Sequence, residues 1–309
     1  MSDGYAFLVA SFLISALRSS VPILLAVLGE TLTQRVGVLN LGVEGQMLLG
    51  AAAGFATTVL TGNPWLGLAA GAAAGVILSS LHALLCVGFR ANQIASGIAI
   101  LLLGMGLSAF YGIPYVGKKI EGFAPVATPE IAAIPVIGGI LGQVTPTVLL
   151  ALVLVPITGY WLYRTRTGLQ WRSVGESVAV AKAAGIRPWS IQVQGILTGG
   201  FLTGLAGAAL SVDYTRTWVE NMTAGRGLVA VGLVIVARWN PYLALPAALL
   251  FGGSEALYLR LQTAGVPVSS YLLATLPYLV SLLVLVISYQ LARKEGAMPS
   301  ELKSVFANT

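Results

Sequence analysis

Long apolar runs separated by short polar stretches dominate the chain from one end to the other. Each run is about 20 residues long, the length that a helix needs to cross the hydrocarbon core of a bilayer. The pattern predicts an all-α polytopic membrane protein with about 8–10 transmembrane helices. Nine candidates follow, at about residues 5–29, 41–61, 65–88, 92–112, 147–163, 190–212, 226–238, 242–261 and 268–290.

Two of these candidates are irregular. Arg18 and Pro22 interrupt the first run, which predicts either one kinked span or a short helix followed by a second partial one. The run at 226–238 is short for a complete crossing. Residues 1–309 otherwise read as one transmembrane domain.

Composition points to the same solvent. Hydrophobic residues make up 57% of the chain, charged residues only 9%, and the mean hydropathy is +0.87. A soluble domain carries about 25% charged residues, so this chain has too few charges for a surface in water. We interpret the net charge of +6 as the bias of membrane proteins towards cationic cytoplasmic loops, not as nucleic-acid binding.

The distribution of cations predicts the orientation. If the loop at 164–189 is cytoplasmic and each candidate crosses once, the cations divide unequally between the two sides, which places the C-terminus and its tail, 291–309, in the cytoplasm. The predicted cytoplasmic set is Arg35, Arg90, Arg164, Arg166, Arg172, Lys182, Arg187, Arg238, Arg293, Lys294 and Lys303. The predicted outer set is Lys118, Lys119, Arg216 and Arg226.

The stretch RVGVLNLGVEGQ, at 35–46, places Glu44 between two glycines at the start of an apolar run. Glycines there permit a non-helical backbone, which membranes tolerate only where protein covers it or a cavity adjoins it. We therefore predict a broken or re-entrant segment near 35–46. Whether Glu44 contacts cargo or ties the segment together stays open from the sequence.

Glycines also recur every four residues, at Gly67, Gly71 and Gly75 and again at Gly200 and Gly204. This spacing predicts close helix–helix packing.

Two long loops separate the spans. The outer loop, 113–146, is rich in proline and glycine, including Pro129, Pro135, Gly138 and Gly139, and predicts short helices at the outer mouth. The inner loop, 164–189, predicts a short cytoplasmic helix at about 175–184.

Four residues of the inner loop define that predicted helix. Ser173 and Glu176 have the spacing of a capping box, Lys182 suits the last turn, and Gly185 suits a C-terminal cap. By physics alone, the helix is either a docking element or an ordinary connection.

Motifs for chemistry are missing from the sequence. It contains no GxxxxGK[ST], GxSxG or HExxH pattern, so we predict no catalytic residue, no metal site and no cofactor in this chain. His82 and Cys86 are single residues of their kind and read as packing residues. Charges within spans are sparse, which disfavours a proton or sodium relay.

Five stretches together resemble the permease subunits of ATP-binding-cassette (ABC) importers of the ribose, branched-chain amino acid and nucleoside group. The resemblance is greatest to the shorter permease of bacterial nucleoside (basic-membrane-lipoprotein-associated) importers. One departure is GLVAVG at 227–232, where the family often has GFIALA. The stretches are ETLTQRVGVLNLGVEGQMLLGA, NQIASGIAILLLGMGLSAFYG, RTGLQWRSVGESVAVAKAAGI, MTAGRGLVAVGLVIVARWNP and LLATLPYLVSLLVLVI.

The resemblance implies a division of labour in a bacterial plasma (inner) membrane. An extracytoplasmic solute-binding protein delivers the substrate, and a longer related permease pairs with this chain, a homodimer being the alternative. A cytoplasmic ABC ATPase, which holds ATP and magnesium, drives transport. The inner-loop helix then resembles the coupling helix that docks on the ATPase, and its candidate residues are Gly175, Glu176, Ala181, Lys182 and Gly185.

For the substrate pathway, the chemistry of a nucleoside favours amides, hydroxyls and aromatic rings. The candidates are Asn40, Glu44, Asn92, Gln93, Ser96, Phe110 and Tyr111. Each has a structural alternative: the asparagines would cap helices and the aromatic residues would lie at the membrane interface.

Other functions remain open at this stage. The same machine could carry a sugar, riboflavin or another small solute. An ion-coupled secondary carrier, which would transport without an ATPase, is the alternative of another class, and a passive channel is a third.

Overall fold

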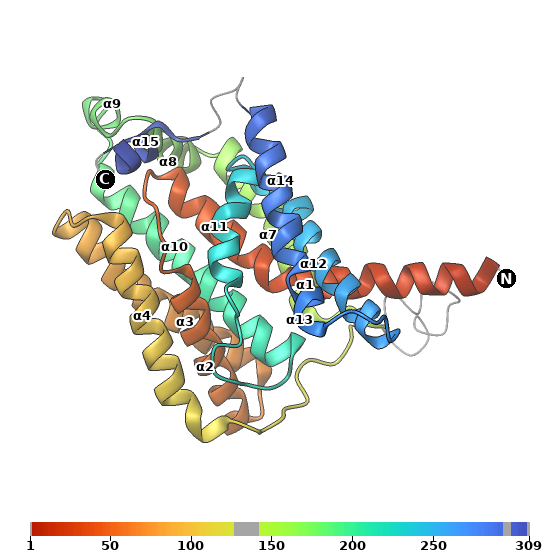
Figure 1. Cartoon of the computed structure of the whole chain (residues 1–309). Coiled ribbons are helices and arrows are strands. Elements are labelled where there is room, and N and C mark those ends of the chain that lie inside the picture. Colours follow the sequence, from red (N-terminus) through yellow and green to blue (C-terminus); the bar gives the residue numbers. More distant parts are fainter. Residues whose placement is uncertain (1, 127–141, 293–297, 308–309) are drawn as a thin grey trace.

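The computed structural model describes residues 2–126, 142–292 and 298–307, and within these ranges the fold is all α-helical (Figure 1). Eight helical segments of the described chain are long and apolar enough to cross a membrane, as predicted. They are built on α1 (Ser2–Arg35), α2 (Val43–Thr61), α3 (Pro64–Ala83), α4 (Gln93–Gly112), α7 (Pro146–Arg164), α10 (Pro188–Ala209), α12 (Pro241–Thr263) and α14 (Leu276–Ala292). The shorter helices are α8 (Arg166–Glu176), α9 (Val178–Ala183), α11 (Arg226–Val236), α13 (Ser270–Ala274) and α15 (Ser300–Ala307).

The two irregular candidates resolve differently. α1 runs without interruption through Arg18 and Pro22, so the first run is one long helix rather than two short ones. α11 has 11 residues, which at 1.5 Å per residue gives about 16 Å, half the thickness of a bilayer core. The prediction of nine complete crossings is therefore wrong by one, because α11 is a half-length helix.

Helix starts follow local capping chemistry. Asn63, Asn92 and Asn240 precede α3, α4 and α12, and each side-chain oxygen accepts a hydrogen bond from a backbone N–H of the first turn. Proline occupies the first turn of α3, α7, α10 and α12, where its missing N–H has no partner to lose. The asparagine and proline signals thus set where the spans begin.

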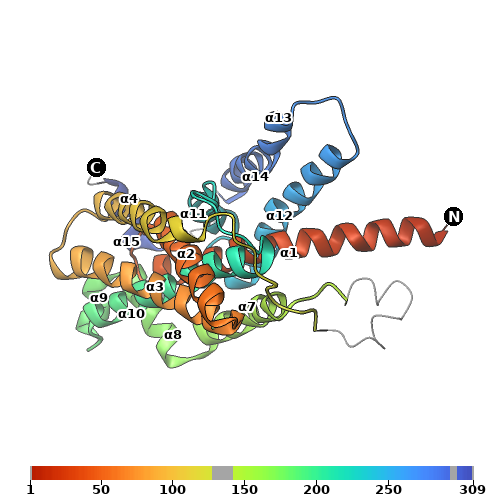
Figure 2. The same cartoon turned by 90° about the horizontal axis from the view of Figure 1, so that it is seen from below.

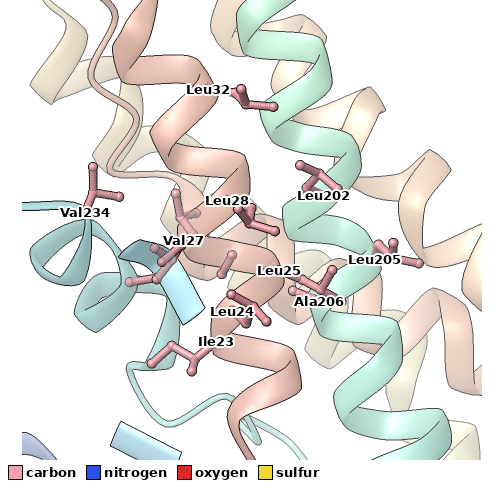
Figure 3. Close-up of a cluster of buried hydrophobic side chains, with 14 of the residues drawn as sticks. Ile23, Leu24, Leu25, Val27, Leu28, Leu32, Leu202, Leu205, Ala206 and Val234 are labelled. Atoms are coloured by element: carbon pink, nitrogen blue, oxygen red, sulfur yellow. The ribbon is translucent and has the colours of Figure 1, made fainter. Parts of the chain in front are cut away.

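α1 and α10 form the centre of the molecule. Of the most apolar window of each span, 83% is buried for the span that contains α10, against 17% for the one that contains α14. Figure 3 shows the side chains of α1 meeting α10 on one side, with Val234 of α11 on the other. The labelled members of this cluster are Ile23, Leu24, Leu25, Val27, Leu28, Leu32, Leu202, Leu205, Ala206 and Val234.

The glycine repeats lie where α2, α3 and α10 meet. A Cβ added to Gly71 would lie 2.7 Å from the carbonyl oxygen of Gly50, and one on Gly204 would collide with the carbonyl oxygen of Gly71. A Cβ on Gly75 would collide with the carbonyl oxygen of Gly200. The predicted close packing is confirmed, and it brings three helix backbones into direct contact.

The outer segments of the fold are less enclosed. Figure 2 shows the first half of α1 and the group α12, α13 and α14 extending away from the main body. The described part of the outer loop includes a 3-10 turn at Ile113–Tyr115 and a β-bridge between Lys119 and Thr217. The predicted outer-mouth helices fall largely on 127–141, which lie outside the described residues.

Candidate pathway and coupling region

The chain leaves helical geometry between α1 and α2, which confirms the predicted break. Residues 36–42 carry no helix, and all of them except Leu41 are fully buried. Gly37 has φ of +79°, a left-handed conformation that glycine adopts without strain. Because this backbone is buried by protein, its N–H groups need partners other than a helical ladder.

Side chains supply several of those partners. The N–H of Leu39 donates to Oε1 of Gln93 at 2.8 Å, and the N–H of Asn40 donates to Oε1 of Glu30 at 3.1 Å. The N–H of Gly42 donates to the side-chain oxygen of Asn40 at 2.9 Å. Polar side chains from α1 and α4 therefore replace the hydrogen bonds that the helix has lost.

These side chains join a buried polar network. Gln34 donates to Glu30 at 2.8 Å and accepts a bond from the indole N–H of Trp239 at 2.5 Å. Asn40 donates to Oε1 of Gln46 at 3.2 Å. The Asn40 amide thus completes the turn before α2 rather than capping that helix directly, since the residue that precedes α2 is Gly42.

Glu44 holds the start of α11. Its carboxylate accepts hydrogen bonds from the hydroxyl of Thr223 at 2.5 Å and from the N–H groups of Gly225 and Gly227 at 2.8 Å and 2.6 Å. The side chain is buried, and the positive end of the α11 dipole favours an anion there. Glu44 therefore ties α2 to a second broken segment, a partner that the sequence did not indicate.

Two further contacts fix the same end of α11. Nη2 of Arg226 pairs with Oε1 of Glu255 at 2.5 Å, and the hydroxyl of Tyr278 donates to the carbonyl of Ala224 at 2.5 Å. The prediction that Arg226 lies at the outer surface is wrong, because its side chain is largely buried in this ion pair. Elements α2, α12 and α14 thus meet at residues 222–227.

The predicted residues on α4 fall into two groups. Asn92 caps α4 by accepting bonds from the N–H groups of Ile94 and Ala95, which bears out its structural alternative. Gln93 supports the break, and the hydroxyl of Ser96 lies 2.9 Å from Nδ1 of His82. These residues lie beside Asn40 at the start of α4.

Phe110 and Tyr111 lie at the other end of α4. They are 70% and 60% exposed, and their ring centroids are 5.2 Å apart in an edge-to-face arrangement. Seventeen residues of helix separate Phe110 from Gln93, a rise of about 25 Å. The fold of a single chain therefore does not bring the aromatic candidates together with the polar ones.

The inner loop contains two helices instead of the single one predicted at 175–184. α8 ends at Glu176 and α9 begins at Val178, with Ser177 in extended geometry between them. The predicted capping box is wrong: the hydroxyl of Ser173 donates to Leu169 within α8. Ser177 is the capping residue, and its hydroxyl accepts from the N–H of Val180 at 3.3 Å.

The predicted C-terminal cap is confirmed. Gly185 has φ of +80°, and its N–H donates to the carbonyl of Lys182 at 3.0 Å. The N–H of Ile186 then donates to the carbonyl of Ala181 at 3.0 Å, so these bonds close the end of α9.

The candidate coupling residues face different ways. Lys182 and Gly185 are exposed, as is Val180, whereas Ala181 is 1% exposed and faces the protein. Gly175 belongs to α8, where an added Cβ would collide with the carbonyl oxygen of Arg35. Glu176 also belongs to α8 and accepts a bond from the hydroxyl of Ser300 at 2.9 Å.

Several predicted cytoplasmic cations gather at this end of the molecule. Nε of Arg35 donates to the carbonyl of Trp239 at 2.7 Å, and the guanidinium of Arg172 lies 5.3 Å from the ring centroid of Tyr163. Arg238 directly precedes Trp239 in the sequence. These cations from α1, α8 and the α11–α12 turn therefore share one side of the molecule.

Sequence reasoning missed several residues of the polar centre. Gln34, Gln46, Thr223 and Glu255 were not proposed as site residues, although each makes a buried hydrogen bond or ion pair. The one local signal was the i, i+4 spacing of Glu30 and Gln34 on α1. In the described chain, no group of three or more His, Cys, Asp or Glu residues is placed to hold a metal ion.

Apolar spans around a buried, polar break define a multi-pass membrane protein. The chain belongs to the family of permease components of branched-chain amino acid transport systems, which matches residues 12–289 and confirms the resemblance noted in the sequence.

Three relatives are named as ABC transporter permeases. TsgC13 of Haloferax volcanii, provisionally named a glucose permease, is 39% identical over 95% of this chain and 96% of its own length. NupQ of Bacillus subtilis, a guanosine permease, is 32% identical over 76% and 78%. NupC of Lactococcus lactis, a nucleoside permease, is 32% identical over 86% and 88%. No solved structure matches the chain significantly.

Proposed function

We propose that this chain forms the translocation pathway of an ATP-driven ABC importer for nucleosides. Family membership across residues 12–289 carries the proposal. Relatives named for guanosine and for nucleosides, which align over at least three quarters of the chain, support the substrate class. The chain's own part is to bind and release cargo weakly, because a solute-binding protein supplies the affinity.

The pathway passes the break between α1 and α2. Asn40, Gln93 and Ser96 place amides and a hydroxyl there, which suit a hydroxylated ring compound. In the present conformation these groups bond to protein partners, so the segment is closed. Cargo passes only when another conformation exchanges those bonds, and the two states must differ in their contacts with it.

Coupling to ATP hydrolysis uses α9. The helix projects beside α8 at one end of the molecule (Figure 1) and exposes Val180 and Lys182 to a partner. Closure of the ATPase, which holds ATP and magnesium, moves α9 and with it α8 and α10. Gly175 lies on the inner side of this unit, against α1, and relays the movement to the end of that helix.

The gathering of Arg35, Arg172 and Arg238 at the α9 end supports a cytoplasmic position for that end and for the C-terminus. On the outer side the chain receives cargo from its binding protein. A longer related permease completes the pathway as a heterodimer, and its contribution would bring aromatic groups closer to the polar break.

A sugar is the second candidate cargo, supported by the glucose permease name of TsgC13 and its 39% identity. Nucleosides and sugars share hydroxyl groups, so the amides near the break suit both. The flat apolar base distinguishes them, because it stacks on aromatic side chains such as Phe110 and Tyr111.

Uptake measurements separate the two cargoes. Cells with the chain deleted, and the same cells with it restored, are given labelled guanosine or labelled glucose. We expect restoration to recover guanosine uptake and unlabelled nucleosides to compete with it, while glucose uptake stays unchanged. Recovery of glucose uptake alone would establish the second candidate, and recovery of neither would reject both.

A further inference from the structure

The C-terminal helix α15 is packed against the coupling region. It lies with α8 and α9 at the same end of the molecule (Figure 1). Leu302 is 1% exposed, and Met298 and Val305 pack against the hydrophobic core from either side of it. This burial fixes α15 to the body of the protein.

Glu301 of α15 contacts the first turn of α9. Its Oε1 accepts a hydrogen bond from the N–H of Val178 at 2.7 Å. Ser177 supplies only one local acceptor, to the N–H of Val180. A helix of six residues is too short to be stable by itself, because nucleation costs more than so few hydrogen bonds return. α9 therefore depends on contacts from outside its own segment.

The same helix also contacts α8 and the break. The hydroxyl of Ser300 donates to Oε2 of Glu176 at 2.9 Å, at the end of α8. A Cβ added to Gly37 would lie 2.8 Å from Cβ of Glu301 and 3.5 Å from Cα of Gly175. One turn of α15 thus lies against the end of α8, the start of α9 and the first residues after α1.

We propose that α15 is a strap that holds the coupling helix in register with the break between α1 and α2, and that Glu301 is its positioning residue. The inference rests on the proposed role of α9 in coupling. Through this strap, a displacement of α9 reaches the backbone at Gly37 without passing along a complete span. Glu301 acts on transport only through α9.

The test compares three variants of the complete transporter. Glu301→Ala removes the acceptor, Glu301→Gln keeps an amide oxygen in its place, and Lys303→Ala changes an exposed residue of the same helix as the control. Two readouts are taken: amide hydrogen exchange of residues 178–183, and ATP hydrolysed per substrate molecule imported.

We expect Glu301→Ala to speed exchange in α9 about tenfold, from the loss of a hydrogen bond to a charged group. It should also raise the ATP consumed per molecule imported. Glu301→Gln should give intermediate values because the bond is retained in weaker form, and Lys303→Ala should match the unmodified protein.

The two readouts separate the strap from the coupling role. Unchanged exchange in α9 in Glu301→Ala would overturn the strap, whatever happens to transport. Faster exchange with an unchanged ATP ratio would uphold the contact and overturn the role of α9 in coupling. If Glu301→Ala does not assemble, Glu301→Gln decides alone: α9 exchange equal to that of Lys303→Ala overturns the strap, and faster exchange in α9 but not in α3 supports it.

Discussion

Glu44 shows how one residue can join two broken segments. Its carboxylate would be costly in the apolar interior, but a hydroxyl and two backbone N–H groups around α11 surround it. The same contacts satisfy donors that a helix start leaves without partners. Removing the carboxylate would therefore expose the deficits of both segments.

We expect Glu44→Ala to lower stability by about 3 kcal/mol, because three buried donors lose a charged acceptor. For a chain of this size that corresponds to a fall in the melting temperature of roughly 6 °C or more. Glu44→Gln keeps one acceptor oxygen and should show a smaller fall. Melting of the purified protein in detergent gives the measurement.

The matched control is Glu220→Gln, an exposed carboxylate in the loop that leads into α11. Its melting temperature should equal that of the unmodified protein. Equal melting temperatures for Glu44→Ala and Glu220→Gln would mean that the Glu44 contacts contribute no stability.

At the scale of elements, glycine surfaces set how closely the helices approach. Backbones of α2, α3 and α10 meet at Gly50, Gly71 and Gly204, where a methyl group would meet a carbonyl oxygen of a neighbouring helix. Close approach gains dispersion contacts that lipid does not offer to larger interfaces. These contacts make α2, α3 and α10 a rigid unit beside the break.

We expect Gly204→Ala to destabilise the protein by about 1–3 kcal/mol, since backbone atoms must shift to admit the methyl group. Gly106→Ala on α4 is the matched control, because nothing lies within 4 Å of its added Cβ. The control should be neutral or slightly stabilising, as alanine is favoured in helices. Thermal melting of both variants decides, and an equal effect would contradict the packing account.

The sequence predicted the elements better than it predicted their junctions. Span length, the glycine repeats and the break at 35–46 were readable because each depends on local composition. The capping box at Ser173 failed because Ser177, four residues later, offered an equivalent hydroxyl next to a true change of direction. The partner of Glu44 could not be found, since 179 residues separate it from Thr223 in the chain.

At the scale of the whole molecule, a rigid centre and exposed arms have different roles. α1 and α10 are enclosed by other helices, whereas α4 and α14 leave much apolar surface for lipid or another subunit. The α8, α9 and α15 group lies at one end and meets the break through Gly37 and Gly175. The molecule thus connects an exposed docking helix to a buried polar segment, as a driven permease requires.

Transport by the intact complex tests the central claim most directly. The chain is purified through an affinity tag with the subunits that it binds, and reconstituted into vesicles beside a preparation of the chain alone. We predict guanosine uptake by the complex that requires ATP and the solute-binding protein, and none by the chain alone under a proton or sodium gradient. Gradient-driven uptake by the chain alone would contradict the account.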